Sequence, residues 1–194
     1  MKKNNFFAMV ARMKYINRWG LMRNTLKENI AEHSLDVAMI AHALATISNI
    51  YFDGKVDAER VAVIAMYHDT TEIITGDMPT PIKYHAKAIK DAYKDIEKTA
   101  ALQLIEGLPK ELKPVYMDIM LPAEEEEELH TFVKAADKLS AYIKCIEEKR
   151  MGNKDFEKAE KATLKAVLAM DMKEVQYFLD NFIPSYSLTL DDQA

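Results

Sequence analysis

Apolar residues recur at helical spacing along nearly the whole chain. Between Glu32 and Ser48 they return every fourth position, which aligns them on one face of an α-helix. Asn29, three positions before Glu32, resembles the start of a capping box and predicts where this helix begins. The same spacing, with its caps and stops, predicts further helices over residues 4–14, 57–74, 82–106, 110–120, 123–151 and 155–181. The pattern therefore predicts an all-α fold of about six or seven helices.

Two short segments interrupt the helical pattern. One covers residues 17–28, and the other, residues 76–81, contains two of the six prolines. Irregular segments on a rigid scaffold often carry binding groups, so both are candidate parts of a functional site. Near the C-terminus, only residues 186–190 suit an extended conformation. We expect one domain over residues 1–194, with its core at about 6–183 and a tail at 184–194.

The composition agrees with a helical domain and argues against other classes of protein. The 194 residues include only 5 Gly and 6 Pro, too few for the many tight turns of a β-sandwich or β-barrel. Hydrophobic residues make up 49% of the chain, which is enough for one sizeable core. No apolar run approaches the roughly 20 residues of a membrane helix, and the first residues lack the apolar stretch of a signal peptide. We therefore expect no association with a membrane.

Charge and cysteine content narrow the class further. The formal net charge of −5 gives the chain no overall basic surface for a nucleic-acid polymer. Arg18, Arg23 and Lys27 nevertheless make the segment 17–28 basic, which suits a small anionic ligand. The single cysteine, Cys145, excludes an intrachain disulfide. Because disulfides are rare in the cytoplasm, we expect a cytoplasmic protein.

Four polar residues fall on the apolar faces of predicted helices. His68 lies on the stripe that faces the core, Asp69 on its flank, and Asp137 on the apolar stripe of another helix. His33 stands in the first turn of a third helix. An unpaired charge in such a setting costs several kcal/mol or shifts its pKa. One divalent cation would account for all four residues, because it binds imidazoles and compensates carboxylates.

Each of these residues also has an ordinary structural interpretation. A lone buried histidine is usually a hydrogen-bonded core residue, and a lone aspartate on an apolar face is more often a cap or an ion-pair partner. Their order along the chain gives the metal interpretation more weight. His33 comes first, the dipeptide His68-Asp69 follows, and Asp137 comes last.

This order resembles the His…His-Asp…Asp pattern of the HD-domain superfamily of metal-dependent phosphohydrolases. Longer matching segments narrow the resemblance to the bacterial HD-domain 5'-deoxynucleotidases (YfbR-like). They are Ile16-Asn17-Arg18-Trp19-Gly20-Leu21-Met22-Arg23-Asn24, Glu28-Asn29-Ile30-Ala31-Glu32-His33-Ser34, Tyr67-His68-Asp69-Thr70-Thr71-Glu72, Thr75-Gly76-Asp77-Met78-Pro79-Thr80-Pro81 and Lys134-Ala135-Ala136-Asp137. The resemblance implies a single HD-domain helical bundle. It also implies an enzyme, a phosphoric monoester hydrolase that converts deoxyribonucleoside 5'-monophosphates to deoxynucleosides and inorganic phosphate.

The same resemblance implies a metal centre and an acid/base residue. His33, His68, Asp69 and Asp137 would hold one divalent metal ion, such as Mn, Co or another transition metal. Such a mixed set of ligands suits first-row transition metals but distinguishes poorly among them. The ion would lower the pKa of a bound water and polarise the phosphoryl group. Glu72, four positions after His68, is the implied general acid/base, whereas spacing alone would equally allow an exposed carboxylate at a helix end.

The resemblance further assigns residues to the substrate. Arg18 would orient the phosphate and so take part in catalysis, because its planar fork matches phosphate oxygens. Trp19 would form a wall of the nucleoside pocket, although a loop tryptophan that packs on the core is common. Asp77 could accept a hydrogen bond from the sugar 3'-hydroxyl, but without the resemblance it is more simply a turn residue. The implied substrate-binding set is Arg18, Trp19, His33, Asp69, Asp77, Met78, Pro79, Thr80 and Asp137.

The remaining candidate groups suggest no other chemistry. His42, His85 and His130 read as surface or packing residues, which favours one metal ion over the two-metal sites of other superfamily members. Cys145 has no evident histidine partner, so covalent catalysis is not expected. Five scattered glycines do not make a phosphate-binding loop.

Other functions remain open on the sequence alone. The protein could be another HD-domain phosphohydrolase, acting on a nucleoside triphosphate or a signalling nucleotide. It could also be a non-catalytic helical protein that binds a nucleotide or a metal ion, or a purely structural bundle. The complete set of His33, His68, Asp69, Glu72 and Asp137 speaks against the non-catalytic binding protein. The resemblance also suggests a homodimer, with which the 12 methionines and the apolar helix surface are compatible.

Overall fold

Helices make up the regular structure of the computed structural model, which describes residues 4–83, 85–121 and 126–193 but not the side chain of Thr80. The longer helices within these residues are α2 (Ile30–Tyr51), α3 (Ala58–Tyr67), α6 (Lys87–Ile105), α7 (Lys113–Met120), α8 (Glu127–Arg150), α9 (Glu157–Leu168) and α10 (Lys173–Asn181). The shorter ones are α1 (Phe6–Val10), α4 (Glu72–Thr75), α5 (Thr80–Lys83) and the 3-10 helices η1 (Ala11–Tyr15), η3 (Lys154–Phe156) and η4 (Ile183–Ser187). The described part contains no strand, so the predicted all-α class is confirmed.

The caps that the sequence predicts for α2 and α3 are present. The side chain of Asn29 accepts hydrogen bonds of 3.0 and 3.1 Å from two backbone N–H groups in the first turn of α2. Asp57 accepts one of 2.9 Å at the start of α3. Each cap satisfies N–H groups that have no partner inside the helix. Helix α2 therefore begins at Ile30, and His33 stands in its first turn.

The predicted helix over residues 57–74 is wrong in one respect, because it consists of two helices. A turn at residues 68–71 separates α3 from α4. Nδ1 of His68 lies 2.7 Å from the carbonyl oxygen of Ala65, which a continuous helix would pair with the N–H of Asp69. A carbonyl only accepts, so the histidine side chain donates here and competes with the helical backbone. The next N–H groups bond three residues back, as Glu72 does to the carbonyl of Asp69 at 3.0 Å.

The predicted helix over residues 155–181 is also wrong as a continuous element. It comprises η3, α9 and α10, and Asp171 separates the two α-helices with a φ of 51°. Aspartate enters this left-handed region more readily than most residues, which allows the chain to change direction. Met170 and Met172 on either side both pack against the main core. The apolar spacing therefore continues across the break, and the sequence pattern does not reveal it.

Smaller differences concern two helix starts and the tail. Helix α6 begins at Lys87 rather than at residue 82, because Thr80–Lys83 form the separate helix α5. Helix α8 is described from Glu127, and its predicted start at residue 123 lies outside the described residues. Residues 186–190 do not form the predicted extended segment as a whole, since the 3-10 helix η4 includes the first two of them and only then does Leu188 adopt an extended backbone. The single domain over 1–194 stays a prediction.

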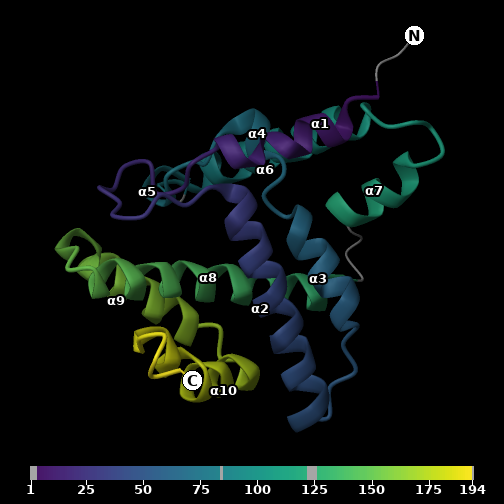
Figure 1. Ribbon diagram of the computed structural model, residues 1–194. Coiled ribbons are helices and arrows are strands. Elements are labelled where there is room, and N and C mark those ends of the chain that lie inside the picture. The colour runs from purple at the N-terminus through teal and green to yellow at the C-terminus, as the bar shows by residue number, and fades with distance from the viewer. Residues whose placement is uncertain (1–3, 84, 122–125, 194) are drawn as a thin grey trace.

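The main core lies where α2, α3 and α8 pack together (Figure 1). Val37 and Leu44 of α2 and Leu139 of α8 are completely buried there. Helices α9 and α10 cover one side of this core and add Val167 and Phe178. Burial of this apolar surface is the main force that fixes the long helices relative to one another.

A second, smaller cluster joins α1 to α6 and α7. Phe6 is buried with Leu104 and Leu108, and its ring lies 4.8 Å from that of Tyr116 in an edge-to-face arrangement. In Figure 1, α4, α5 and the segment between η1 and α2 lie at the same end of α2. Both irregular segments singled out by the sequence therefore meet at the start of α2. No helix in the described ranges is long and apolar enough to cross a lipid bilayer.

Two leucines on α2 test this description of the core. Leu44 is 0% exposed and Leu35 is 55% exposed. We expect Leu44→Ala to lower the free energy of unfolding by about 3 kcal/mol, because it leaves a cavity in the core. The matched variant Leu35→Ala should change it by less than about 0.5 kcal/mol. Urea unfolding followed by circular dichroism measures both, and equal effects would contradict the packing described.

Candidate active site

Residues from α2, the turn after α3, and α8 meet at the N-terminal end of α2. One ligand atom from each of His33, His68 and Asp69 lies within 4.8 Å of the other two. Nε2 of His33 and Nε2 of His68 are 3.5 and 3.2 Å from the same oxygen, Oδ2 of Asp69. From α8, Oδ1 of Asp137 lies 3.1 Å from Nε2 of His33. The four residues with the predicted metal-binding pattern are thus neighbours in space.

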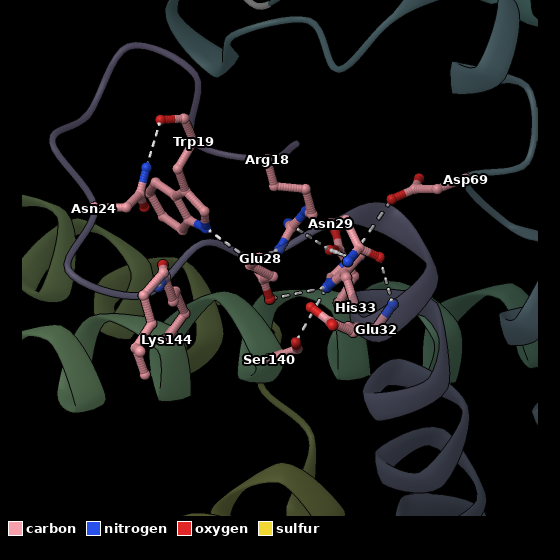
Figure 2. A network of polar contacts seen from close by, with 12 residues as sticks. Arg18, Trp19, Asn24, Glu28, Asn29, Glu32, His33, Asp69, Ser140 and Lys144 are labelled. Atoms are coloured by element: carbon pink, nitrogen blue, oxygen red, sulfur yellow. Dashed lines mark hydrogen bonds and ion pairs between the residues drawn. The ribbon is translucent and has the colours of Figure 1, made fainter. Parts of the chain in front are cut away.

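Groups behind the two imidazoles determine which ring nitrogen faces this centre. Nδ1 of His68 donates to the carbonyl of Ala65, so a neutral His68 ring carries its lone pair on Nε2. Nδ1 of His33 lies 3.1 Å from Oγ of Ser140 and 3.9 Å from Oε1 of Glu28, as Figure 2 shows. Such partners orient metal-binding histidines in proteins. Both Nε2 atoms therefore face the aspartates.

His33 shows that a cation fits here. Its side chain is 0% exposed, and its Nε2 makes no hydrogen bond within the described part of the structure. A buried polar atom without a hydrogen-bond partner costs free energy, and such atoms are rare in proteins. A transition-metal ion held by His33, His68, Asp69 and Asp137 would satisfy this nitrogen and the neighbouring carboxylates together. The donor set of imidazoles and carboxylates suits such an ion without selecting one element.

The charges at the centre compensate one another. Burial acts to raise the pKa of Asp69, but the charges of His68, His33 and Arg18 hold it well below its usual value. Burial also acts to raise the pKa of Asp137, but its contacts with His33 outweigh burial and lower this pKa. Against burial, Asp69 raises the pKa of His68 to about 9. A bound cation would therefore take the place of a proton on His68.

Glu72 is a buried carboxyl group close to these charges. Its side chain is 7% exposed, and Oε2 has no hydrogen-bond partner in the described residues. Burial, followed by the negative charges of Asp69 and Asp77, raises the pKa of Glu72 to about 9. A nearby cation lowers such a pKa, because it favours the ionised form. This carboxyl group is therefore suited to exchange a proton at neutral pH.

One carboxylate positions both Arg18 and Trp19. Oε2 of Glu28 accepts hydrogen bonds from Nη1 of Arg18 at 2.8 Å and from Nε1 of Trp19 at 3.0 Å (Figure 2). Trp19 has a φ of 58°, which a bulky residue adopts only when its surroundings fix it. This role of Glu28 is not predicted from the sequence. The one feature that could have indicated it is a carboxylate at the end of an otherwise basic segment.

Of the three basic residues in segment 17–28, Arg18 is the one that brings positive charge to this site. Nη2 of Arg18 lies 3.7 Å from Oδ1 of Asp137. Burial opposes its charge, but Glu28 and the nearby aspartates keep the pKa of Arg18 above its usual value. Arg23, in contrast, is 88% exposed and lies 3.7 Å from Asp155, while Lys27 is exposed. Arg18 is therefore the cation of this segment that the structure places beside the aspartates.

The second irregular segment approaches the same centre from α4. Gly76 has a φ of 71° and a ψ of 163°, a conformation that is essentially restricted to glycine. Its carbonyl accepts a hydrogen bond of 3.0 Å from Thr75, whose hydroxyl lies 3.1 Å from that of the buried Tyr93. These contacts fix the point at which the segment leaves α4.

Asp77 follows this fixed point and lies near Arg18. Burial raises the pKa of Asp77, although the charge of Arg18 opposes the shift. Met78 and Pro79 are half-buried beside it. Thr80 begins α5, and its side chain lies outside the described residues.

Other titratable residues do not join the centre. His42 and His85 are exposed and His130 is half-buried, and none of them is in the one potential metal-binding group found among the described residues. Cys145 is completely buried. Burial raises the pKa of its thiol to about 11, which makes it a poor nucleophile at neutral pH.

An all-α bundle with this arrangement of His33, His68, Asp69 and Asp137 defines an HD-domain protein. The chain belongs to the 5'-deoxynucleotidase YfbR-like family, whose family model matches residues 5–186. A relative from Photorhabdus temperata, named 5'-deoxynucleotidase yfbR, is 50% identical over 189 residues, which cover 97% of this chain and 96% of the relative. A 5'-deoxynucleotidase of Yersinia pestis is 52% identical over 190 residues, with the same coverage of 97% and 96%.

Solved structures share the fold at lower sequence identity. An HD-domain phosphohydrolase from Listeria innocua superposes with a TM-score of 0.82 at 20% identity, covering 97% of this chain and 91% of that one. The HD phosphohydrolase of cyanophage S-2L, bound to dA and one catalytic Zn²⁺ ion, gives a TM-score of 0.66 at 20% identity. That alignment covers 92% of this chain and 96% of that one. The shared architecture is therefore that of HD-domain phosphohydrolases.

Two histidines test the metal centre by a measurement that needs no substrate. We expect His68→Ala to lower the affinity for Mn or Co at least about tenfold, because it removes a proposed direct ligand. Loss of a residue that only orients a ligand already lowers metal affinity by about 10–100-fold. The exposed His42 provides the control, because His42→Ala should leave metal affinity unchanged. Calorimetric titration of the metal-free proteins measures both. Equal affinity in His68→Ala and the unmodified protein would rule out this centre.

Proposed function

We propose that the protein is a metal-dependent 5'-deoxynucleotidase. It hydrolyses deoxyribonucleoside 5'-monophosphates to a deoxynucleoside and inorganic phosphate, and so acts in nucleotide metabolism. The observation that carries this proposal is the meeting of the His33, His68 and Asp69 group with the half-buried cation of Arg18 and the buried acid of Glu72. The relatives named 5'-deoxynucleotidase support it over nearly the whole chain.

The proposed cofactor is one divalent metal ion, Mn, Co or another transition metal. His33, His68, Asp69 and Asp137 would hold it. When bound, the ion supplies a water of lowered pKa and polarises the phosphoryl group. The single catalytic Zn²⁺ ion of the cyanophage HD phosphohydrolase supports one ion rather than two.

Arg18 and Glu72 are the proposed catalytic residues. Arg18 is already oriented by Glu28, and its remaining N–H groups can bind phosphate oxygens and align the phosphorus for attack. Glu72 can take a proton from the attacking water, or give one to the 5'-oxygen as the bond to phosphorus breaks. His33, Asp69 and Asp137, as metal ligands, would border the same phosphate.

The nucleoside would lie between the two irregular segments. Trp19 offers the face of its indole ring as one wall, with its ring N–H already occupied by Glu28. Asp77 is the proposed acceptor for the sugar 3'-hydroxyl, and Met78, Pro79 and Thr80 complete the opposite wall. The substrate is therefore a small nucleotide and not a nucleic-acid polymer.

We also propose a cytoplasmic homodimer. The support for self-association is the exposure of methionines on several helices, with Met39 56%, Met66 45% and Met117 42% exposed. Light scattering coupled to gel filtration measures the mass, and a mass equal to the 22.2 kDa of one chain would contradict the dimer.

Glu72→Gln tests the catalytic assignment. We expect it to lower kcat for dAMP or dTMP by about 10²–10⁴-fold, the usual contribution of a general acid or base. Metal content should stay unchanged, because Glu72 is not a proposed ligand. Phosphate release with Mn or Co, with and without a chelator, measures activity.

Equal turnover of Glu72→Gln and the unmodified protein would overturn the role of Glu72. No phosphate release with any metal would overturn the proposed function. Release of pyrophosphate or triphosphate from a nucleoside triphosphate would identify a different HD-domain phosphohydrolase.

Asp77→Ala tests the contact with the sugar. We expect it to lower kcat/KM for dTMP by about 10–100-fold, since a hydrogen bond to a charged group contributes about 1.5–3 kcal/mol. The control substrate is 2',3'-dideoxythymidine 5'-monophosphate, which lacks the 3'-hydroxyl and should be hydrolysed equally by both proteins. A similar loss on both substrates would show that Asp77 does not contact the 3'-hydroxyl.

A further inference from the structure

A second buried carboxylate, away from the metal-binding residues, faces the segment that carries Arg18 and Trp19. Glu148, near the end of α8, is 1% exposed. Oε1 accepts from the backbone N–H groups of Thr25 and Leu26, both at 3.1 Å, and Oε2 accepts from Thr25 at 2.9 Å. These backbone groups belong to loop 17–29, the stretch between η1 and α2.

Two neighbours of Glu148 extend the contact with the loop. Nζ of Lys144 donates to Glu148 at 2.5 Å and to the carbonyl of Leu26 at 2.6 Å. Nδ2 of Asn153 donates to Glu148 at 2.7 Å and to the carbonyl of Arg23 at 2.8 Å. We call Lys144, Glu148 and Asn153 the Glu148 cluster. It binds the loop through backbone N–H and C=O groups alike, so it fixes the path of the backbone.

The opposite end of the same loop carries the substrate residues. Its two ends are joined by hydrogen bonds of 2.9 Å from the N–H of Arg18 to the carbonyl of Glu28 and of 3.0 Å from Ile30 to Ile16. Across the loop, the side-chain amide of Asn24 donates to the carbonyl of Trp19 at 3.2 Å (Figure 2). A displacement at residues 23–26 would therefore reach Trp19.

An aromatic contact links the Glu148 cluster to Trp19 by a second route. Phe156 lies in η3, three residues after Asn153, and is 0% exposed. Its ring lies 5.3 Å from that of Trp19 and 5.9 Å from Nζ of Lys144. The end of α8 and η3 thus form one support beneath the loop.

A buried ionised side chain is rarely stable unless hydrogen bonds and opposite charges compensate it. Glu148 is compensated in this way. Burial acts to raise the pKa of Glu148, but bonds from Lys144, Asn153 and the loop N–H groups lower it to about 2. A buried ion pair of this kind adds little to stability compared with apolar packing. Its effect is instead to favour one particular arrangement of the groups that it binds. The arrangement it specifies here is that of the loop.

We propose that Lys144, Glu148 and Asn153 are positioning residues for substrate binding. They hold loop 17–29 so that Arg18 and Trp19 have their binding geometry before a nucleotide arrives. Ordering the loop in advance removes an entropic cost from binding. This proposal rests on the proposed function for the identity of the substrate, whereas the ordering of the loop can be measured without it.

Asn153→Asp is the most selective variant. Oδ1 of Asn153 accepts from the N–H of Asp155 at the start of η3, and aspartate makes the same cap. The variant loses the Nδ2 donor to Arg23 and places an oxygen against Glu148. Glu148→Gln is the second variant, and it removes the charge that Lys144 and the loop N–H groups bind.

Trp19 is the only tryptophan, so its fluorescence reports on the loop alone. We expect both variants to increase the quenching of Trp19 by acrylamide in the absence of substrate. KM for dAMP should rise about tenfold, the loss of about 1.4 kcal/mol of binding free energy. The kcat should stay within about twofold, because the bound nucleotide restores the loop. Affinity for Mn should not change, since none of the three residues is among the metal ligands.

Ser48→Ala is the matched control for stability. Oγ of Ser48 donates to Glu174 at 2.6 Å and joins α2 to α10, and the side chain is 5% exposed. This variant should lower Tm without changing KM or the quenching of Trp19. If Asn153→Asp behaves in the same way, with only Tm lowered, the Glu148 cluster is merely structural and the proposal is overturned.

The outcomes separate this proposal from the proposed function. If the unmodified protein releases no phosphate, the proposed function fails, and the quenching of Trp19 still decides whether the cluster orders the loop. If Glu148→Gln does not fold, Asn153→Asp decides the question alone, because Asn153 is only half-buried.

Discussion

The hydrogen bond from His68 to the carbonyl of Ala65 is the interaction on which the active site depends. It ends α3, because it takes the acceptor that the next helical turn needs. It also directs Nε2 of His68 toward Asp69 and requires Nδ1 to carry a proton, because Nδ1 is the donor to the carbonyl. The turn it creates brings Asp69 to the centre and starts α4 at Glu72. One side-chain contact thus sets the tautomer of His68, the position of Asp69, and the position of the proposed acid/base residue Glu72.

His33 connects this centre to the substrate loop. Its Nε2 faces Asp69 and Asp137, while its Nδ1 faces Ser140 and Glu28. Glu28 in turn binds the side chains of the loop through its second oxygen. The proposed metal ligands and phosphate-binding groups therefore belong to one connected network. His33 at the middle of this network is completely buried, whereas the side chain of Asp137 is 43% exposed. Because the members contact one another, a change at one of them is expected to reach both the proposed metal site and the loop.

Sequence reasoning succeeded where a residue contradicted its surroundings. His33, His68, Asp69 and Asp137 are polar positions on apolar faces, and the structure brings these four together. It failed where the structure depends on a polar contact made by a side chain, either with a nearby carbonyl or with another side chain. Neither the break after α3 nor the role of Glu28 changes the apolar spacing. Lys144 and Glu148 did leave a signal, since both are charged and lie one helical turn apart on the buried side of α8.

In a helical bundle, the core orders the helices, and the loops between them need additional contacts to hold one conformation. Long helices fix the side chains that project from them, and Ser140 and Glu28 further orient the ring of His33 on α2. Loops between helices receive no such order from the core, so polar contacts must supply it. The Glu148 cluster does this for loop 17–29, and Thr75 with Tyr93 does it at Gly76. The Glu148 cluster lies apart from the proposed metal ligands, so substitutions in the cluster can change substrate affinity without changing metal affinity.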